Sequence, residues 1–252
     1  MIKDILSSIK TYFKAMRIIK ELNLWKYFFV PALIGLLLGG IFFTTAYSLS
    51  DNLGTYLSSF WKFDFGKDFV TTASTWIGGF AILIIGLILY KHLLMALSAP
   101  FMTPVSEKVE AYITRKETPK TAGKSEFIKL LLRSLRLNLR NLIKELLFTL
   151  PLLILSFIPV IGLVATLLIL FIQSYYTGFG NMDYTLERYL NYKESKAFVR
   201  KNKGIAVGNG LVFTLMLFIP LVGIMLTLPI ATVASTVDTI NRLEETNPKF
   251  ND

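Results

Sequence analysis

The sequence has no cysteine and one histidine, and only 17% of its 252 residues are charged. The absence of cysteine excludes disulfides and thiolate nucleophiles. A zinc site needs three or four protein ligands, so a histidine-rich site is excluded as well, and we predict no metal and no cofactor. Soluble domains carry about 25% charged residues. A soluble globular enzyme is therefore not expected.

The single histidine, His92, follows Lys91 at the end of an apolar block, and we interpret it as a residue at a membrane interface rather than as a catalytic base. The sequence contains no Walker A motif, no Ser-His-Asp set and no zincin motif. Most nucleophilic schemes therefore lack a base. We predict that the protein is not an enzyme.

Hydrophobic residues make up 53% of the chain, and most of them lie in four blocks: 28–49, 69–90, 146–172 and 205–237. Block 28–49 has no charge over 22 positions. As a helix it would be about 33 Å long, enough to cross a hydrocarbon core of about 30 Å. We predict a second span at 69–90. The whole chain, 1–252, is predicted to form one all-α, polytopic membrane domain.

The last two apolar blocks share an internal repeat, in which residues 150–168 match residues 211–229. Each copy contains Phe-Ile-Pro-x-x-Gly, and Pro and Gly three residues apart are typical of a turn. The turn residues are Pro159 and Gly162 in the first copy and Pro220 and Gly223 in the second. Each block is then a hairpin of two helices of about 12–15 residues, too short to span a membrane fully. The alternative is one proline-kinked spanning helix per block.

Basic residues indicate the orientation of the chain in the membrane. Residues 1–27 hold six Lys and Arg, residues 50–68 hold two and residues 91–149 hold eleven. We therefore expect a cytoplasmic N-terminus and an external loop at 50–68. Six more basic residues in 173–204 would lie outside if block 146–172 crossed the membrane, so they favour re-entrant hairpins and a cytoplasmic C-terminus. Hairpin tips must be buried in protein or line a cavity, which implies an oligomer or a central pathway.

Two further segments combine basic and apolar residues with a helical period. Segment 1–27 predicts an amphipathic helix that lies on an anionic membrane surface or packs on the protein itself. Segment 126–145 predicts a helix with one basic stripe and a Leu-rich face. This helix is either interfacial on anionic lipid or the wall of a vestibule that concentrates anions. Nucleic-acid binding is not expected, because no aromatic residues interleave with the stripe.

Several charges fall close to the predicted spans. Glu107 and Glu110 lie three residues apart on an expected helix after Pro104. Asp183, Glu187 and Arg188 follow Gly180. A charge at membrane depth costs a few kcal/mol and points to function. The alternative is that these are solvated cytosolic side chains.

The runs at 16–35, 97–119 and 182–204, together with Phe-Ile-Pro-Val-Ile-Gly and Phe-Ile-Pro-Leu-Val-Gly, resemble the CysZ-type sulfate permeases of bacteria. Etoposide-induced endoplasmic reticulum proteins are eukaryotic relatives of that family. The resemblance implies two long spanning helices, two partly inserted hairpins, and a dimer or larger homo-oligomer in the bacterial inner membrane. It also implies sulfate uptake for cysteine synthesis, without ATP hydrolysis by the protein.

The resemblance implies an anion-binding site just before the first span, where the family has Gly-hydrophobic-Arg. The matching stretch here contains Asn23, Leu24, Trp25 and Lys26. Asn still tolerates unusual backbone angles. Lys26 supplies a point charge instead of a bidentate guanidinium fork. We therefore expect Asn23, Leu24 and Lys26 to bind sulfate or a related oxyanion.

The resemblance also places Glu107 and Glu110 where the family has acidic residues, and we expect them to line or gate the pathway with a basic partner. Arg133, Arg136 and Arg140 are expected to set a positive field on the cytoplasmic side. The function predicted is passive or gradient-coupled permeation of a sulfate-type anion. The alternative is a non-transporting scaffold that shapes or organises the bilayer.

Overall fold

The computed structural model describes residues 1–59, 67–116, 124–219 and 222–246, and gives no side-chain description for 46–81 or for three isolated positions. All regular structure in the described residues is helical, as the sequence predicts. The elements are α1 (Ile2–Glu21), η1 (Leu24–Phe28), α2 (Phe29–Ser59), α3 (Lys67–Thr114), α4 (Lys124–Leu155), α5 (Ile161–Leu186), α6 (Tyr192–Lys201), α7 (Lys203–Leu217) and α8 (Val222–Thr246).

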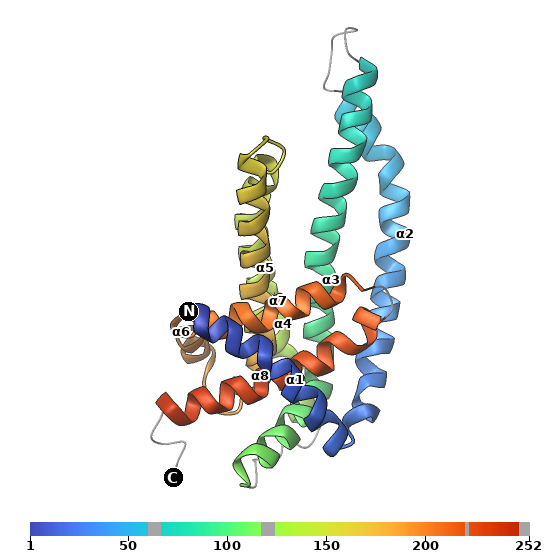
Figure 1. Ribbon diagram of the computed structural model, residues 1–252. Coiled ribbons are helices and arrows are strands. Elements are labelled where there is room, and N and C mark those ends of the chain that lie inside the picture. The colour runs from blue at the N-terminus through green and yellow to red at the C-terminus, as the bar shows by residue number, and fades with distance from the viewer. Residues whose placement is uncertain (60–66, 117–123, 220–221, 247–252) are drawn as a thin grey trace.

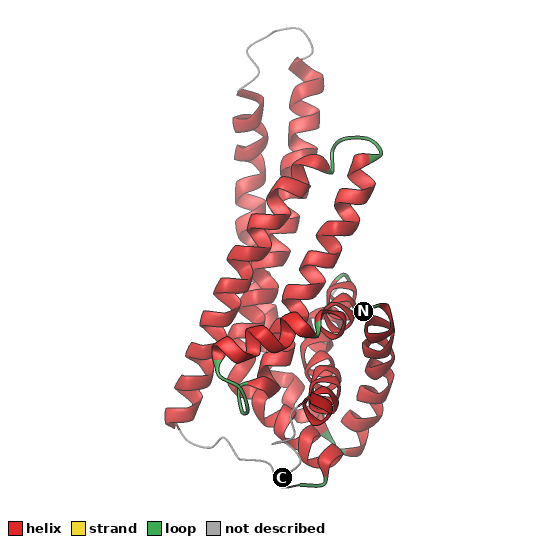
Figure 2. Cartoon of the chain, turned by 90° about the vertical axis from the view of Figure 1, so that its left-hand side faces the viewer, coloured by secondary structure: helices red, strands yellow, loops and turns green. Residues whose placement is uncertain are grey.

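The helices form two upright pairs and a transverse group (Figure 1). The long helices α2 and α3 lie side by side, and the shorter α4 and α5 rise in the same direction, as the turned view in Figure 2 also shows. Helices α1, α7 and α8 contact one another and lie across the lower end of the upright helices. We call this lower end, together with the three transverse helices, the foot of the molecule.

Three helical stretches in the described residues are long and apolar enough to cross a membrane: Leu24–Thr45, Ile82–Thr114 and Ile161–Leu186. The first overlaps the predicted span 28–49. The second belongs to α3, which covers the predicted span 69–90 and continues far beyond it. The third, Ile161–Leu186, was predicted as a hairpin arm too short to span a membrane. Helices α2 and α3 also extend into the predicted loop 50–68, so that loop was predicted too long.

Helix α3 runs without a break through Pro100 and Pro104. Each proline lacks the N–H that would bond to the carbonyl four residues earlier, so the carbonyls of Ala96 and Pro100 lose their usual helical donors. The carbonyls one residue before these accept side-chain hydrogen bonds, that of Met95 from the Tyr184 hydroxyl (2.7 Å) and that of Ala99 from Thr103 (3.1 Å). The continuous helix carries the segment after Pro104 along the core of the foot.

The predicted boundary between an interfacial helix at 126–145 and a hairpin starting at 146 is wrong. Helix α4 is continuous from Lys124 to Leu155, through Pro151. The change from basic to apolar composition marks a change in the surroundings of one helix and not the end of that helix. The basic stripe and the first arm of the hairpin therefore belong to one helix.

The described residues of the two repeated motifs make matching hydrogen bonds. The Gly162 N–H donates to the carbonyl of Ile158 (2.7 Å), and the Gly223 N–H donates to the carbonyl of Ile219 (2.8 Å). A Cβ on either glycine would lie 2.2 Å from a backbone oxygen, so both turns require glycine. Block 146–172 is thus a helix–turn–helix with Pro159 in its turn, and not one kinked helix. Pro220 lies outside the described residues.

The second arm of each hairpin is longer than the predicted 12–15 residues. Helix α5 has 26 residues and α8 has 25. Helix α5 continues past the apolar block into Gly178–Leu186, which mixes polar residues such as Asn181 and Asp183 with core residues and is buried throughout against other helices. Burial in protein, instead of in lipid, allows a polar sequence to continue the same helix.

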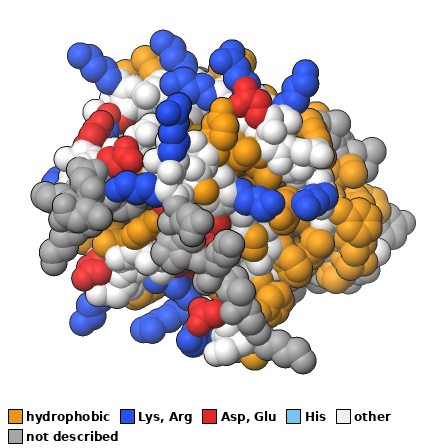
Figure 3. Space-filling view, turned by 90° about the horizontal axis from the view of Figure 1, so that it is seen from below, with side chains coloured by type: hydrophobic (Ala, Val, Ile, Leu, Met, Phe, Trp, Pro, Cys, Tyr) orange, Lys and Arg blue, Asp and Glu red, His pale blue; other side chains and the backbone are white. Residues whose placement is uncertain are grey.

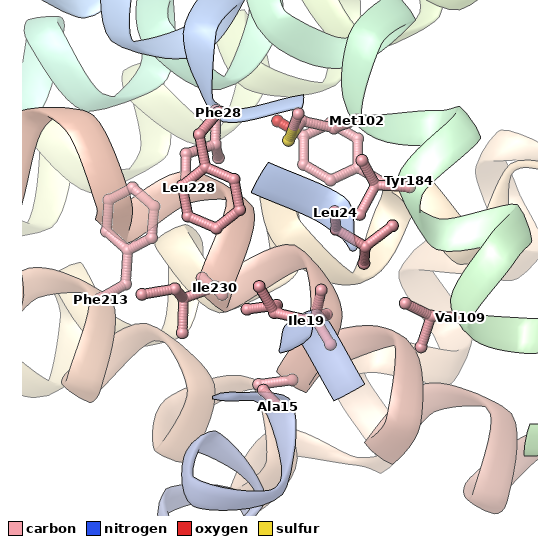
Figure 4. Packing of buried hydrophobic residues seen from close by; sticks show 14 of the residues in the cluster. Ala15, Ile19, Leu24, Phe28, Met102, Val109, Tyr184, Phe213, Leu228 and Ile230 are labelled. Atoms are coloured by element: carbon pink, nitrogen blue, oxygen red, sulfur yellow. The ribbon is translucent and has the colours of Figure 1, made fainter. Parts of the chain in front are cut away.

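The main core lies at the foot, where α1, η1, α3, α7 and α8 meet. Ala15 and Ile19 of α1 pack with Leu24, Phe28 and residues of the other helices (Figure 4). Helix α1 thus packs on the protein, as one of the two predicted alternatives states. Its opposite face leaves Ile2 and Phe13 more than 70% exposed, so the helix also keeps an unpacked apolar side.

Candidate functional site

The predicted anion-binding residues lie at the junction of α1 and η1. Asn23 is the N-cap of η1 and has left-handed backbone angles (φ 48°, ψ 52°), a conformation that asparagine tolerates better than most residues. Leu24 is completely buried and fixes the junction on the core. Asn23 and Lys26 are exposed. The side chain of Leu24 therefore cannot touch a solvated anion, whereas Lys26 can.

A second lysine joins Lys26. The Nζ atoms of Lys26 and Lys108 each lie 5.4 Å from the centroid of the Tyr27 ring. Lys108 is exposed on α3, and neither ammonium group forms a salt bridge within the described part of the chain. Two positive charges without a carboxylate partner thus converge on one aromatic ring. Sequence reasoning missed Lys108, because only the continuation of α3 brings it to η1.

The acidic residues predicted to line a pathway are buried in the same helix. Arg188 forms a salt bridge with Glu110, and the Tyr189 hydroxyl also donates to that carboxylate. Arg188 further donates to Ser106 Oγ (2.9 Å) and to the carbonyl of Tyr184 (2.7 Å). Glu107 lies just before this group and is 9% exposed. These charges are not the solvated side chains of the alternative interpretation.

Arg133 is engaged by a different carboxylate. Its Nε and Nη2 atoms donate to the two oxygens of Asp183 (3.1 and 2.9 Å). It also donates to the carbonyl of Leu190 and to Ser195 Oγ, each at 2.9 Å. A guanidinium with this many protein partners fixes α4 against the α5–α6 junction. It is not free to attract a solvated anion.

Glu187 lies between the two ion pairs. Burial raises the pKa of its carboxyl to about 8, and the charge of Asp183 acts in the same direction. Thr103 donates a hydrogen bond to Glu187, and Arg133 and Arg188 oppose the shift only in part. At neutral pH this carboxyl is therefore mainly protonated.

The raised pKa predicts a pH dependence. The pKa of Glu187 is about 8 in the folded protein and about 4.5 in the unfolded chain. Its contribution to stability is therefore complete below about pH 4.5 and is lost as the pH rises through about 8. At pH 9 the buried Glu187 carboxyl is ionised, whereas a glutamine stays neutral. We therefore expect Glu187→Gln to be more stable than the unsubstituted protein at pH 9 by on the order of a few kcal/mol, and to have a higher Tm. Thermal unfolding in detergent at pH 6 and pH 9 measures this effect. Parallel pH profiles for the two proteins would contradict the assignment.

The five predicted pathway residues do not all meet. Glu110 and Arg133 contact Arg188 and Asp183 at the end of α5, and Glu107 lies one turn before Glu110 on α3. Arg136 and Arg140 lie apart: the Cζ of Arg136 is 4.8 Å from the Tyr192 ring centroid, and that of Arg140 is 5.4 Å from the Phe179 centroid. Figure 3, a view from the foot, shows Lys and Arg side chains projecting around this end of the molecule.

The interpretation of His92 as an interfacial residue is wrong. Its side chain is 2% exposed, with Nε2 2.9 Å from Glu145 Oε2 and Nδ1 3.1 Å from Asn138 Oδ1. Lys91 Nζ lies 2.6 Å from the other Glu145 oxygen. Helix α4 packs alongside α3 and supplies these partners, so the end of the apolar block faces protein. The described residues contain no group of three or more His, Asp or Glu suited to a metal ion.

These features define a class of protein: a helical membrane protein that buries paired charges beside helices long enough to span a bilayer. The chain belongs to the family described as sulfate transporter CysZ/etoposide-induced protein 2.4, whose model matches residues 11–227. The resemblance read from the sequence motifs is thus confirmed.

Curated relatives of the chain are named sulfate transporter CysZ. The chain is similar to the sulfate transporter CysZ of Pseudomonas aeruginosa, with 29% identity over 161 residues, or 63% of this chain and 65% of the relative. It is also similar to the sulfate transporter CysZ of Pseudomonas fluorescens, with 30% identity over 142 residues, or 56% of this chain and 57% of the relative. These matches span less than two thirds of the length of each relative.

Proposed function

We propose that the protein is a permease for sulfate or a related divalent oxyanion. The observation that carries this proposal is the pair of unneutralised ammonium groups, Lys26 and Lys108, beside the left-handed Asn23. Lys26 lies at the start of the stretch Leu24–Thr45, which is long enough to span a bilayer, and Lys108 reaches the Tyr27 ring from α3. The name of the relatives supports sulfate as the substrate. Two point charges on one ring favour a divalent anion over a monovalent one.

The proposed pathway continues along α3. Glu107 and Glu110 lie on either side of Lys108 within one turn of α3, and the Glu110–Arg188 pair forms a closed gate. An oxyanion that reaches the gate competes with Glu110 for the guanidinium of Arg188. Arg136 and Arg140 contribute to the positive potential around the foot, whereas Arg133 holds the wall of the pathway through Asp183.

In the proposed topology, α2 and α3 span the inner membrane of a bacterium, the α4–α5 pair enters it as a hairpin, and the transverse α7–α8 pair lies at its cytoplasmic side. The foot and both termini face the cytoplasm, in agreement with the distribution of basic residues. Val160 and Leu163 at the first hairpin tip are 87% and 72% exposed. A homo-oligomer that covers these tips completes the transport unit, which supplies sulfate for cysteine synthesis.

Uptake of labelled sulfate into vesicles containing the purified protein tests the proposal. We expect uptake above that of protein-free vesicles, and a several-fold loss in Lys26→Ala because half of the charge pair is removed. The control is Lys129→Ala, which removes an exposed lysine that is paired with Glu126. Absence of uptake for several oxyanions would refute the proposal and favour the scaffold function.

A further inference from the structure

One face of α4 is basic in its first half and apolar in its second. By helical spacing, Arg136 and Arg140 share this face with Leu139, Ile143 and Leu147. These three apolar side chains are 52%, 58% and 66% exposed. The face therefore presents two guanidinium groups next to a continuous apolar strip that extends toward the hairpin turn.

Helix α6 adds a third cation to the basic half of the face. The Nζ of Lys196 lies 5.1 Å from the centroid of the Tyr192 ring, the same ring that Arg136 contacts. A capping box fixes α6, in which the Asn191 side chain accepts from backbone N–H groups and Glu194 accepts from the Asn191 N–H (2.9 Å). The acidic side chain closest in sequence to Lys196 is thus occupied at the helix cap, while the ring and the lysine are held in place.

The cations of this face have no acidic partners. Arg136, Arg140 and Lys196 form no salt bridge in the part of the chain that the structure describes. Arg133, one turn earlier on α4, is instead fully engaged by Asp183. The fold thus neutralises Arg133 with a carboxylate, whereas Arg136 is exposed and the half-buried Arg140 donates only to the neutral Asn141 Oδ1 (2.9 Å), so both keep a positive charge that an external anion can balance.

We propose that this face, built from Arg136, Arg140, Tyr192 and Lys196, binds the phosphate headgroup of an anionic phospholipid. The cations and the ring hold the phosphodiester at the depth where tyrosine is enriched in membrane proteins. The acyl chains lie along Leu139, Ile143 and Leu147. A free oxyanion would need only the charges, whereas a phospholipid uses both halves of the face, so the apolar strip identifies the lipid as the occupant.

The inference does not depend on the proposed transport function, because the anion site at Lys26 and Lys108 is built from other helices. A lipid bound here would fix α6 to the outer side of α4. It would thereby support the α5–α6 junction from which Arg188 reaches Glu110.

Thermal unfolding of the detergent-solubilised full-length protein tests the inference. We expect dioleoyl phosphatidylglycerol to raise Tm by several degrees more than dioleoyl phosphatidylcholine. The double substitution Arg136→Gln/Lys196→Gln is expected to lose at least half of this lipid-specific increase. The matched control Lys129→Gln/Lys193→Gln, which removes two exposed lysines from the same two helices, should retain it.

Three results would overturn the inference. The first is an equal phosphatidylglycerol effect in the Arg136→Gln/Lys196→Gln variant and the unsubstituted protein. The second is an equal loss in the control variant, which would indicate a diffuse charge effect. The third is an increase of the same size with inorganic phosphate or glycerol phosphate, which would indicate a free-anion site. If the double variant unfolds early in every lipid, the single variants Arg136→Gln and Lys196→Gln decide, because each should lose part of the effect.

Discussion

Gly178→Ala is expected to destabilise the protein by more than about 3 kcal/mol, and in practice to prevent accumulation of folded protein. A Cβ at residue 178 would lie 1.8 Å from the carbonyl oxygen of Ala206. At the same crossing, a Cβ on Gly210 would lie 1.8 Å from the carbonyl oxygen of Ser174. Both obstacles are backbone atoms of packed helices, so no side-chain rotation can relieve them.

The spacing of these residues explains the close approach. Ser174 and Gly178 lie four residues apart on α5, and Ala206 and Gly210 lie four apart on α7. Two small-xxx-small steps thus face each other, which allows the helix backbones to touch. An added methyl group must separate the helices, and every buried residue between α5 and α7 then loses contacts.

Gly86→Ala is the matched control, because a Cβ at Gly86 has no heavy atom within 4 Å. This substitution should be neutral or should stabilise the helix by up to about 1 kcal/mol. Expression yield, gel filtration and Tm in detergent measure both variants. A Gly178→Ala protein that unfolds at the temperature of the Gly86→Ala protein would show that the α5–α7 crossing is not a tight one.

Local signals in the sequence predicted the helical class and the turns. Proline and glycine three residues apart act within one turn, so Pro159 and Gly162 could be assigned without knowledge of the fold. The left-handed backbone of Asn23 agrees with the expectation, which came from the family resemblance, that asparagine tolerates unusual angles at this position. These features depend only on residues close in the sequence.

Features that depend on the surroundings of a helix were predicted less well. The end of α5 was placed too early because polar residues interrupt the apolar pattern after residue 172, and the sequence does not show that protein instead of water surrounds them. His92 was assigned to an interface because Glu145, its partner, lies on another helix. Lys108 was missed as a neighbour of Lys26 for the same reason. Such pairs follow from helix packing, which one sequence does not specify.

Glu145→Gln is expected to cost about 3–5 kcal/mol, because removing one partner of a buried ion pair leaves an uncompensated charge. The Lys91–Glu145 pair is at most 2% exposed, and Glu145 also contacts His92. The glutamine keeps the shape of the side chain but leaves the Lys91 ammonium in a dry interior without a counter-charge. The substitution therefore loosens the contact between α3 and α4.

A double-mutant cycle separates the charge from the shape. Lys91→Met/Glu145→Gln removes both charges, so we expect it to recover part of the stability lost in Glu145→Gln, with a coupling of about 1–3 kcal/mol. The exposed pair Glu126–Lys129 on the same helix, with a similar separation of 2.7 Å, is the control. Its Glu126→Gln substitution should change stability by less than about 1 kcal/mol. Thermal unfolding of the four proteins of the cycle measures the coupling. If the double variant is less stable than Glu145→Gln alone, Lys91 contributes through its packing and not through its charge, and the α3–α4 contact does not depend on this ion pair.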